Sequence, residues 1–150
     1  MSKSNSFETS LLSMIFNNQA IANVGDAAGV QPSVAPGSFY LRLYTDAVVV
    51  SDSVVGTEAA YTGYVTGGIA VARSGAGWTV VGNNATNAAA VTFGACSAGS
   101  ENLRYFAVWL DNTTTLESHR LYWGTLTSDL AVSTGITPEF AIGSINVNED

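Results

Sequence analysis

The sequence has little of what usually supports catalysis or covalent stabilisation. Its 150 residues contain one cysteine, one histidine and three prolines. A lone cysteine excludes an internal disulfide, so we expect Cys96 to be a small buried apolar side chain. No segment has the apolar length that a signal peptide or a membrane-spanning helix requires, which predicts a protein made in the cytoplasm without membrane contact.

Charged residues are also scarce, at 11% of the chain, and the net charge is −7. The five Lys and Arg residues are scattered and form no basic stripe, which argues against direct binding to nucleic acid. Solubility must therefore depend on hydroxyl and amide groups. Such a surface is typical of proteins that remain in permanent assemblies.

No arrangement of residues in the sequence indicates an enzyme or a metal site. His119 could nominally form a triad with Asp111 and a serine, but no Gly-x-Ser-x-Gly motif is present, and nothing in the sequence supports the pairing. Asp46, Asp52 and Glu58 share one loop without a calcium-binding pattern, so we expect solvated charges there. The sequence predicts no catalytic residue, no metal and no cofactor.

Residues 5–22 show the one helical pattern, with apolar side chains at three- and four-residue steps: Phe7, Leu11, Met14, Ile15 and Ala22. Asn5 is placed to cap this helix, and Glu8 lies three residues later, as in a capping box. The segment 24–37 that follows is rich in Gly, Ala and Pro and is longer than most connections. We interpret it as an extended contact arm.

After Pro36 the apolar pattern changes to period two, which indicates β-strands. Strands are expected at about 39–44, 68–73, 78–81, 89–93, 103–110, 120–126 and 139–147. Turn residues and no helical spacers separate them, so the predicted fold is mainly β, an antiparallel β-sandwich or jelly roll with one N-terminal helix. The expected division is a helix and arm at 1–37 and a β-sandwich domain at 38–150. Trp78, Trp109 and Trp123 are expected to pack in its core.

Several motifs resemble a family of short tailed-bacteriophage structural proteins, which includes capsid decoration (cement) and tail-fibre-like proteins. They are Tyr40-Leu41-Arg42-Leu43-Tyr44-Thr45, Tyr61-Thr62-Gly63-Tyr64, Ala107-Val108-Trp109-Leu110-Asp111 and Leu121-Tyr122-Trp123-Gly124-Thr125-Leu126. The resemblance spans most of the chain. It implies a non-enzymatic virion protein, most simply a decoration protein that binds the major capsid protein and copies of itself as a homo-oligomer. A tail- or fibre-associated protein that binds a receptor or glycan is the alternative, followed by a carbohydrate-binding module or an enzyme.

The candidate attachment surface lies in the N-terminal helix and arm. Its residues are Phe7, Leu11, Met14, Ile15, Pro32 and Pro36. Leaving large apolar side chains in water costs about 1.5–3 kcal/mol each relative to burying them, so the helix is expected to pack either on its own domain or on a partner.

Overall fold

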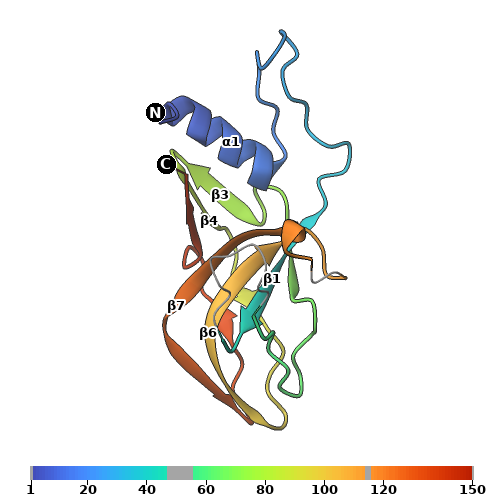
Figure 1. The fold of residues 1–150 in the computed structure, drawn as a ribbon, viewed down its shortest axis with the longest axis vertical. Coiled ribbons are helices and arrows are strands. Elements are labelled where there is room, and N and C mark those ends of the chain that lie inside the picture. Colours follow the sequence, from blue (N-terminus) through green and yellow to red (C-terminus); the bar gives the residue numbers. More distant parts are fainter. Residues whose placement is uncertain (1, 47–55, 114–115, 150) are drawn as a thin grey trace. The chain divides into compact units, whose positions relative to one another are not determined.

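The structure is a computed structural model that describes residues 2–46, 56–113 and 116–149. It is mainly β with one N-terminal α-helix, as predicted (Figure 1). The elements are α1 (Asn5–Asn17), β1 (Ser38–Tyr44), β2 (Ile69–Ala72), β3 (Trp78–Val81), β4 (Asn84–Asn87), β5 (Val91–Thr92), β6 (Ser100–Trp109), the 3-10 turn η1 (Glu117–His119), β7 (Arg120–Ser133), β8 (Glu139–Phe140) and β9 (Asn146–Asn148).

The strands form antiparallel pairs in three sheets. One sheet has four strands in the order β2-β1-β6-β7, a second has three in the order β3-β4-β9, and β5 pairs with β8. The finer prediction of a sandwich or jelly roll stays a prediction.

The chain divides into two compact units. Unit 1 comprises Met1–Gly37, Ala72–Val91 and Phe140–Asp150, and unit 2 comprises Ser38–Val71 and Thr92–Glu139. Unit 1 contains helix α1 and the three-stranded sheet, whereas the four-stranded sheet lies almost wholly in unit 2. The predicted division into residues 1–37 and 38–150 stays a prediction.

Helix α1 starts at the expected place but is shorter than expected. Its N-cap is Ser4, one residue before the predicted cap, and the Ser4 side chain accepts a hydrogen bond from the backbone N–H of Phe7. The helix ends at Asn17, not at residue 22, because Asn18 adopts a left-handed conformation with φ of 54°. Asparagine tolerates this conformation better than most residues, so Asn18 stops the helix.

The buried face of α1 packs within unit 1. Leu12 and Phe16 are fully buried, and the Phe16 ring lies 4.6 Å from the Trp78 ring of β3. Glu8 shares this face and is only 5% exposed. Aliphatic side chains from β4 and the C-terminal segment complete this core: Ala85, Ile145 and Val147.

Strand β4 was not predicted, because residues 82–84 have the composition of a turn. Only Gly82 and Asn83 form the turn, since Val81 already pairs with Asn84. Gly82 has φ of +61°, which suits the first position of a two-residue hairpin turn. The rest of β4 is stabilised by pairing with β3 on one side and β9 on the other.

In unit 2, strand β1 is buried on both faces towards its end. Leu41 and Leu43 point one way and Arg42 and Tyr44 the other, yet all four are buried. Arg42 is 2% exposed and stacks on Trp109, with its guanidinium carbon 4.1 Å from the ring centre. The polar face expected from the alternation is therefore part of the interior.

The predicted core roles are confirmed for three of four residues. Trp78, Trp109 and Cys96 are buried. Trp123 is 39% exposed, so its predicted place in the core is wrong. The reason is its position on β7, which is the edge strand of the four-stranded sheet among the described residues.

Candidate partner-binding surface

The apolar residues that the sequence singled out on α1 lie beside its buried face. At 3.6 residues per turn, Ile15 and Leu11 flank the buried residues, and Phe7 and Met14 lie further round towards the outside. Phe7 is 40% exposed, while Leu11, Met14 and Ile15 are partly buried. We call these four residues the α1 stripe. Its members reach water even though the helix packs on its own domain.

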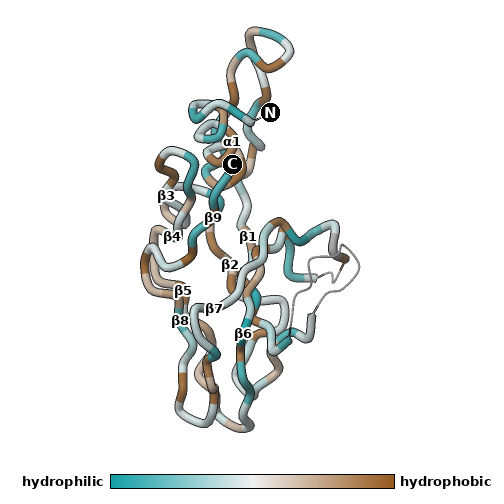
Figure 2. The backbone as a smooth tube through the Cα atoms, turned by 60° about the vertical axis from the view of Figure 1, so that its left-hand side comes forward, coloured by the Kyte–Doolittle hydropathy of each residue, from teal (hydrophilic) through white to brown (hydrophobic). Residues whose placement is uncertain are grey.

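The segment that follows α1 is an ordered hairpin, which we call the arm hairpin (residues 18–33). Figures 1 and 2 show it projecting from the end of α1, and apolar segments occur along both of its sides in Figure 2. Ile21 and Val30 pair in antiparallel fashion through two backbone hydrogen bonds of 2.9 Å. The predicted arm is thus extended, and the Ile21–Val30 bridge joins its two sides.

Two further sets of hydrogen bonds define the arm hairpin. At its base, the Asn18 side chain donates to the Ser33 carbonyl at 2.8 Å and accepts from the Ser33 N–H at 2.9 Å. At its tip, the Asp26 carboxylate accepts from the N–H groups of Ala28 and Gly29. Gly29 has φ of +65°, and a Cβ added there would lie 2.0 Å from the Ile21 carbonyl oxygen, so only glycine fits.

Arg73 ties the arm hairpin to the end of α1. Its guanidinium donates to the carbonyl oxygens of Met14 and Ile15, each at 2.6 Å, and to the Ser33 hydroxyl at 3.1 Å. A cation bound to the last carbonyl groups of a helix is also favoured by the helix dipole. This arginine, which sequence reasoning did not connect to the arm, fixes the stripe and the hairpin base relative to each other.

The predicted prolines lie beside this surface rather than on the α1 stripe. Pro32 and Pro36 are both exposed in the returning strand and the connection to β1. The structure therefore brings Met14 and Ile15 close to the hairpin base, while Phe7 lies two helical turns away and the prolines belong to the arm.

The His119–Asp111 pair, which nothing in the sequence supported, is present in the structure. His119 Nδ1 is hydrogen-bonded to Asp111 Oδ2, and Asp111 Oδ1 accepts from the Thr113 N–H at 2.9 Å. Leu110 N–H donates to the His119 carbonyl at 2.8 Å. These bonds close the base of the loop between β6 and β7, which is a structural role for the pair.

Glu58 corrects the expectation of solvated loop carboxylates. Its carboxylate lies 3.5 Å from the Arg42 guanidinium and accepts from the Tyr64 hydroxyl at 2.9 Å and the Gly67 N–H at 2.8 Å. Burial raises the pKa of Tyr64 far above its ordinary value, so the hydroxyl remains a donor. Asp46 accepts hydrogen bonds from Thr57, whereas Asp52 lies outside the described residues.

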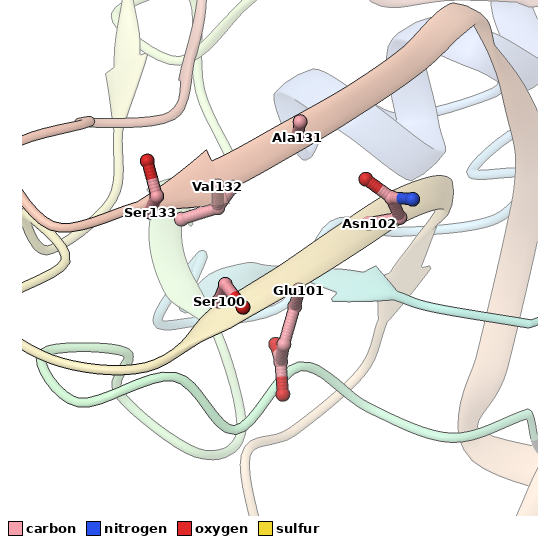
Figure 3. Close-up of a pocket in the computed structure, with 6 residues that line it drawn as sticks. All are labelled: Ser100, Glu101, Asn102, Ala131, Val132 and Ser133. Atoms are coloured by element: carbon pink, nitrogen blue, oxygen red, sulfur yellow. The ribbon is translucent and has the colours of Figure 1, made fainter.

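A hollow in unit 2 has a volume of about 260 Å³ and lies along paired residues of β6 and β7 (Figure 3): Ser100, Glu101, Asn102, Ala131, Val132 and Ser133. Glu101 uses both carboxylate oxygens to accept from the Ala60 N–H, at 3.1 and 3.0 Å. The hollow therefore offers small and amide side chains and one engaged carboxylate. No set of three metal-ligating side chains occurs in the described residues, and no helix among them is long and apolar enough to cross a membrane.

The fold is that of a small, mainly β protein with one N-terminal helix. The sequence profile described as "Podophage GP4 fiber I protein gp80" matches residues 2–148, and the chain belongs to this Gp80 family. The predicted resemblance to tailed-phage structural proteins is thereby confirmed, as is a place in the virion. No curated protein gave a significant match.

The family corrects the order of the two predicted roles. A fibre protein corresponds to the tail- or fibre-associated alternative better than to capsid decoration. It also supports a structural, non-enzymatic role. The major capsid protein as partner stays a prediction.

Proposed function

We propose that this chain is a tail-fibre-associated virion protein that attaches to another virion protein through the α1 stripe and the arm hairpin. The observation that carries the proposal is the double character of α1. Leu12 and Phe16 are the residues of α1 that fill the core of unit 1, so the apolar residues beside them are not needed for that core. Full burial of an exposed large apolar side chain contributes about 1.5–3 kcal/mol, and burial of Phe7, Leu11, Met14 and Ile15 in an interface would gain the part of it that their exposed area represents.

The arm hairpin adds pre-organised contact area to the stripe. Its base is fixed by Asn18, Ser33 and Arg73, so little conformational freedom is lost there on binding. Val24, Val30 and Val34 are exposed along the arm. A partner with a complementary apolar groove can therefore contact the stripe and the hairpin base together.

The test replaces Phe7 and Met14 together, as Phe7→Ser/Met14→Ser. Both side chains lie away from the core, so the free energy of unfolding should change by less than about 1 kcal/mol. The matched control is Val81→Ser/Ile142→Ser, which removes two exposed apolar side chains elsewhere in unit 1. Deleting residues 1–36 is a poorer test because it also removes Leu12 and Phe16 from the core.

Phage carrying each variant are purified, and the copies of this protein per particle are measured by quantitative mass spectrometry. We expect the stripe variant to be lost from particles and the control to be retained. Normal incorporation of the stripe variant would reject this attachment surface. Normal incorporation together with loss of adsorption to host cells would instead assign the stripe to receptor binding.

A further inference from the structure

The three-stranded sheet of unit 1 has two faces of different composition. Strands β3, β4 and β9 lie side by side in this sheet (Figure 2). One face carries the buried residues Trp78, Ala85 and Val147, and the Trp78 ring contacts Phe16 of α1. Because side chains alternate between the faces of a sheet, the residues between them point away from α1. We call this second face the outer face: Thr79, Val81, Asn84, Thr86, Asn146 and Asn148.

The strand register arranges the outer face in two rows that run across the sheet. One row consists of Thr79, Thr86 and Asn146, and the other of Val81, Asn84 and Asn148. Neighbours within a row are about 4.8 Å apart, and the two rows are separated by about 6.8 Å along the strands. Asn84 and Thr86 of the central strand are partly buried, and the other four residues are exposed. The outer face therefore reaches solvent on all three strands.

Asparagine is an unusual residue for three positions of the outer face, because it is depleted in β-strands. A fourth asparagine of this sheet, Asn87, has a structural explanation. Its buried side chain donates to the carbonyls of Ala89 and Ala141, each at 2.8 Å, and accepts from the Ile145 N–H at 2.9 Å. The three outer asparagines make no such bond to the core in the described ranges. Residues that oppose the local preference without a structural gain are expected at functional sites.

Hydrogen bonds among the three outer asparagines fix their orientation. Asn84 Nδ2 donates to Oδ1 of Asn146 and, at 2.6 Å, to Oδ1 of Asn148. The Nδ2 groups of Asn146 and Asn148 and the Oδ1 atom of Asn84 have no hydrogen-bond partner among the described residues. An amide group can make more bonds than these side chains use. The outer face thus presents pre-oriented donors and an acceptor, which lowers the entropy cost of binding a ligand.

The composition of the outer face restricts the ligand. None of residues 78–87 and 146–148 is charged, and the following Glu149 pairs with Lys3 at 3.1 Å. The net charge of −7 disfavours an anionic polymer. The outer face also has no aromatic or arginine side chain, the types that contribute most to protein–protein contacts. Neutral molecules rich in hydroxyl groups remain, because a sugar hydroxyl both donates to an amide oxygen and accepts from an amide N–H.

We propose that the outer face binds a neutral polysaccharide, whose hydroxyl groups pair with the amides of Asn84, Asn146 and Asn148. The methyl groups of Val81 and of the threonines provide apolar contact for the C–H groups of the sugar rings. The site lies on the opposite face of the sheet from α1. Attachment through the α1 stripe and polysaccharide binding therefore use different surfaces and can be tested separately.

The first experiment titrates the full-length protein with neutral oligosaccharides of glucose, galactose, mannose, rhamnose and N-acetylglucosamine, and with heparin and polygalacturonate as anionic probes. We expect calorimetry to detect at least one neutral oligosaccharide with a Kd between about 10 μM and about 10 mM. Because no charge takes part, this Kd should change by less than about twofold between about 50 mM and about 500 mM salt. No binding of any neutral probe, or binding of the anionic probes alone, would overturn the proposal.

The second experiment compares Asn148→Val with the control Asn102→Val, which makes the same change at an exposed asparagine of β6. Valine is favoured in strands, so both variants should fold. We expect Asn148→Val to weaken binding of the neutral oligosaccharide at least about tenfold and the control to leave it within about twofold. Equal effects of the two substitutions, or an unchanged affinity of Asn148→Val, would contradict the proposal.

A third measurement separates the outer face from the attachment surface. Phage carrying Asn148→Val are purified, and we expect them to retain the normal number of copies of this protein per particle. Loss of the variant from particles with unchanged oligosaccharide binding would make the outer face a contact between proteins and would overturn the proposal. Loss of the Phe7→Ser/Met14→Ser variant from particles concerns the α1 stripe alone, so the two proposals fail in different ways.

Discussion

On the β1 side of the four-stranded sheet, Arg42 and Glu58 lie 3.5 Å apart with side chains only 2% and 16% exposed. On the β7 side, Arg104 and Asp129 are closer, at 2.9 Å, but their side chains are 49% and 56% exposed. The shorter distance does not identify the stronger contribution. Water screens the charges of the pair beside β7. In the pair beside β1, each buried charge needs the opposite charge to offset the cost of its removal from water.

The buried pair on the β1 side has further contacts around it. Arg42 also stacks on Trp109 and donates to the Asp111 carbonyl at 2.8 Å, so it connects β1, β6 and the following loop. Burial and the nearby Glu58 charge raise the pKa of Tyr44 to about 12, which keeps its hydroxyl neutral beside Arg42. The β1 side thus holds unit 2 together, whereas the pair on the β7 side lies largely in water.

The largest loss of stability is expected from Glu58→Ala, on the β1 side. The substitution leaves the Arg42 cation buried without its carboxylate and removes the acceptor of Tyr64 and Gly67. The free energy of unfolding should fall by about 3–5 kcal/mol, the usual result of breaking a buried ion pair. Urea unfolding measures the change. A loss below about 1 kcal/mol would mean that the two Arg–carboxylate pairs are equivalent.

A smaller effect is expected from Tyr64→Phe, which keeps the ring but removes the hydroxyl. That hydroxyl donates to Glu58 at 2.9 Å and accepts from the Leu43 N–H at 3.2 Å. Leaving these partners unpaired should cost about 1–3 kcal/mol of unfolding free energy. Tyr105→Phe on β6, where the side chain is only partly buried, is the control and should change it by less than about 0.5 kcal/mol. Equal losses would show that the Tyr64 hydroxyl has no special role.

The sequence predicted what depends on local pattern. Period-two alternation located β1, and the three- and four-residue steps located α1 and the stripe of Phe7, Leu11, Met14 and Ile15. The pattern could not tell which apolar face packs on the domain, because Leu12 and Phe16 are buried through contact with β3, a strand distant in sequence. Capping was misplaced by one residue because Ser4 and Asn5 are both good cap residues.

Contacts between residues far apart in the chain could not be predicted either, because local patterns carry no information about them. Nothing near Arg42 indicates that Glu58 and Trp109 will enclose it, and nothing near Arg73 indicates contact with Met14 and Ile15. Sequence spacing also cannot tell a central strand from an edge strand. Trp123 was therefore assigned to the core, although the order of strands leaves it partly in water.

The smallest effect is expected from Asp129→Ala, which breaks the exposed pair with Arg104 in the same unit. Both side chains can return to water, so the free energy of unfolding should fall by less than about 1 kcal/mol, and the loss should shrink further as salt is added. A loss as large as that of Glu58→Ala, undiminished by salt, would show that the β7 side is as important for folding as the β1 side.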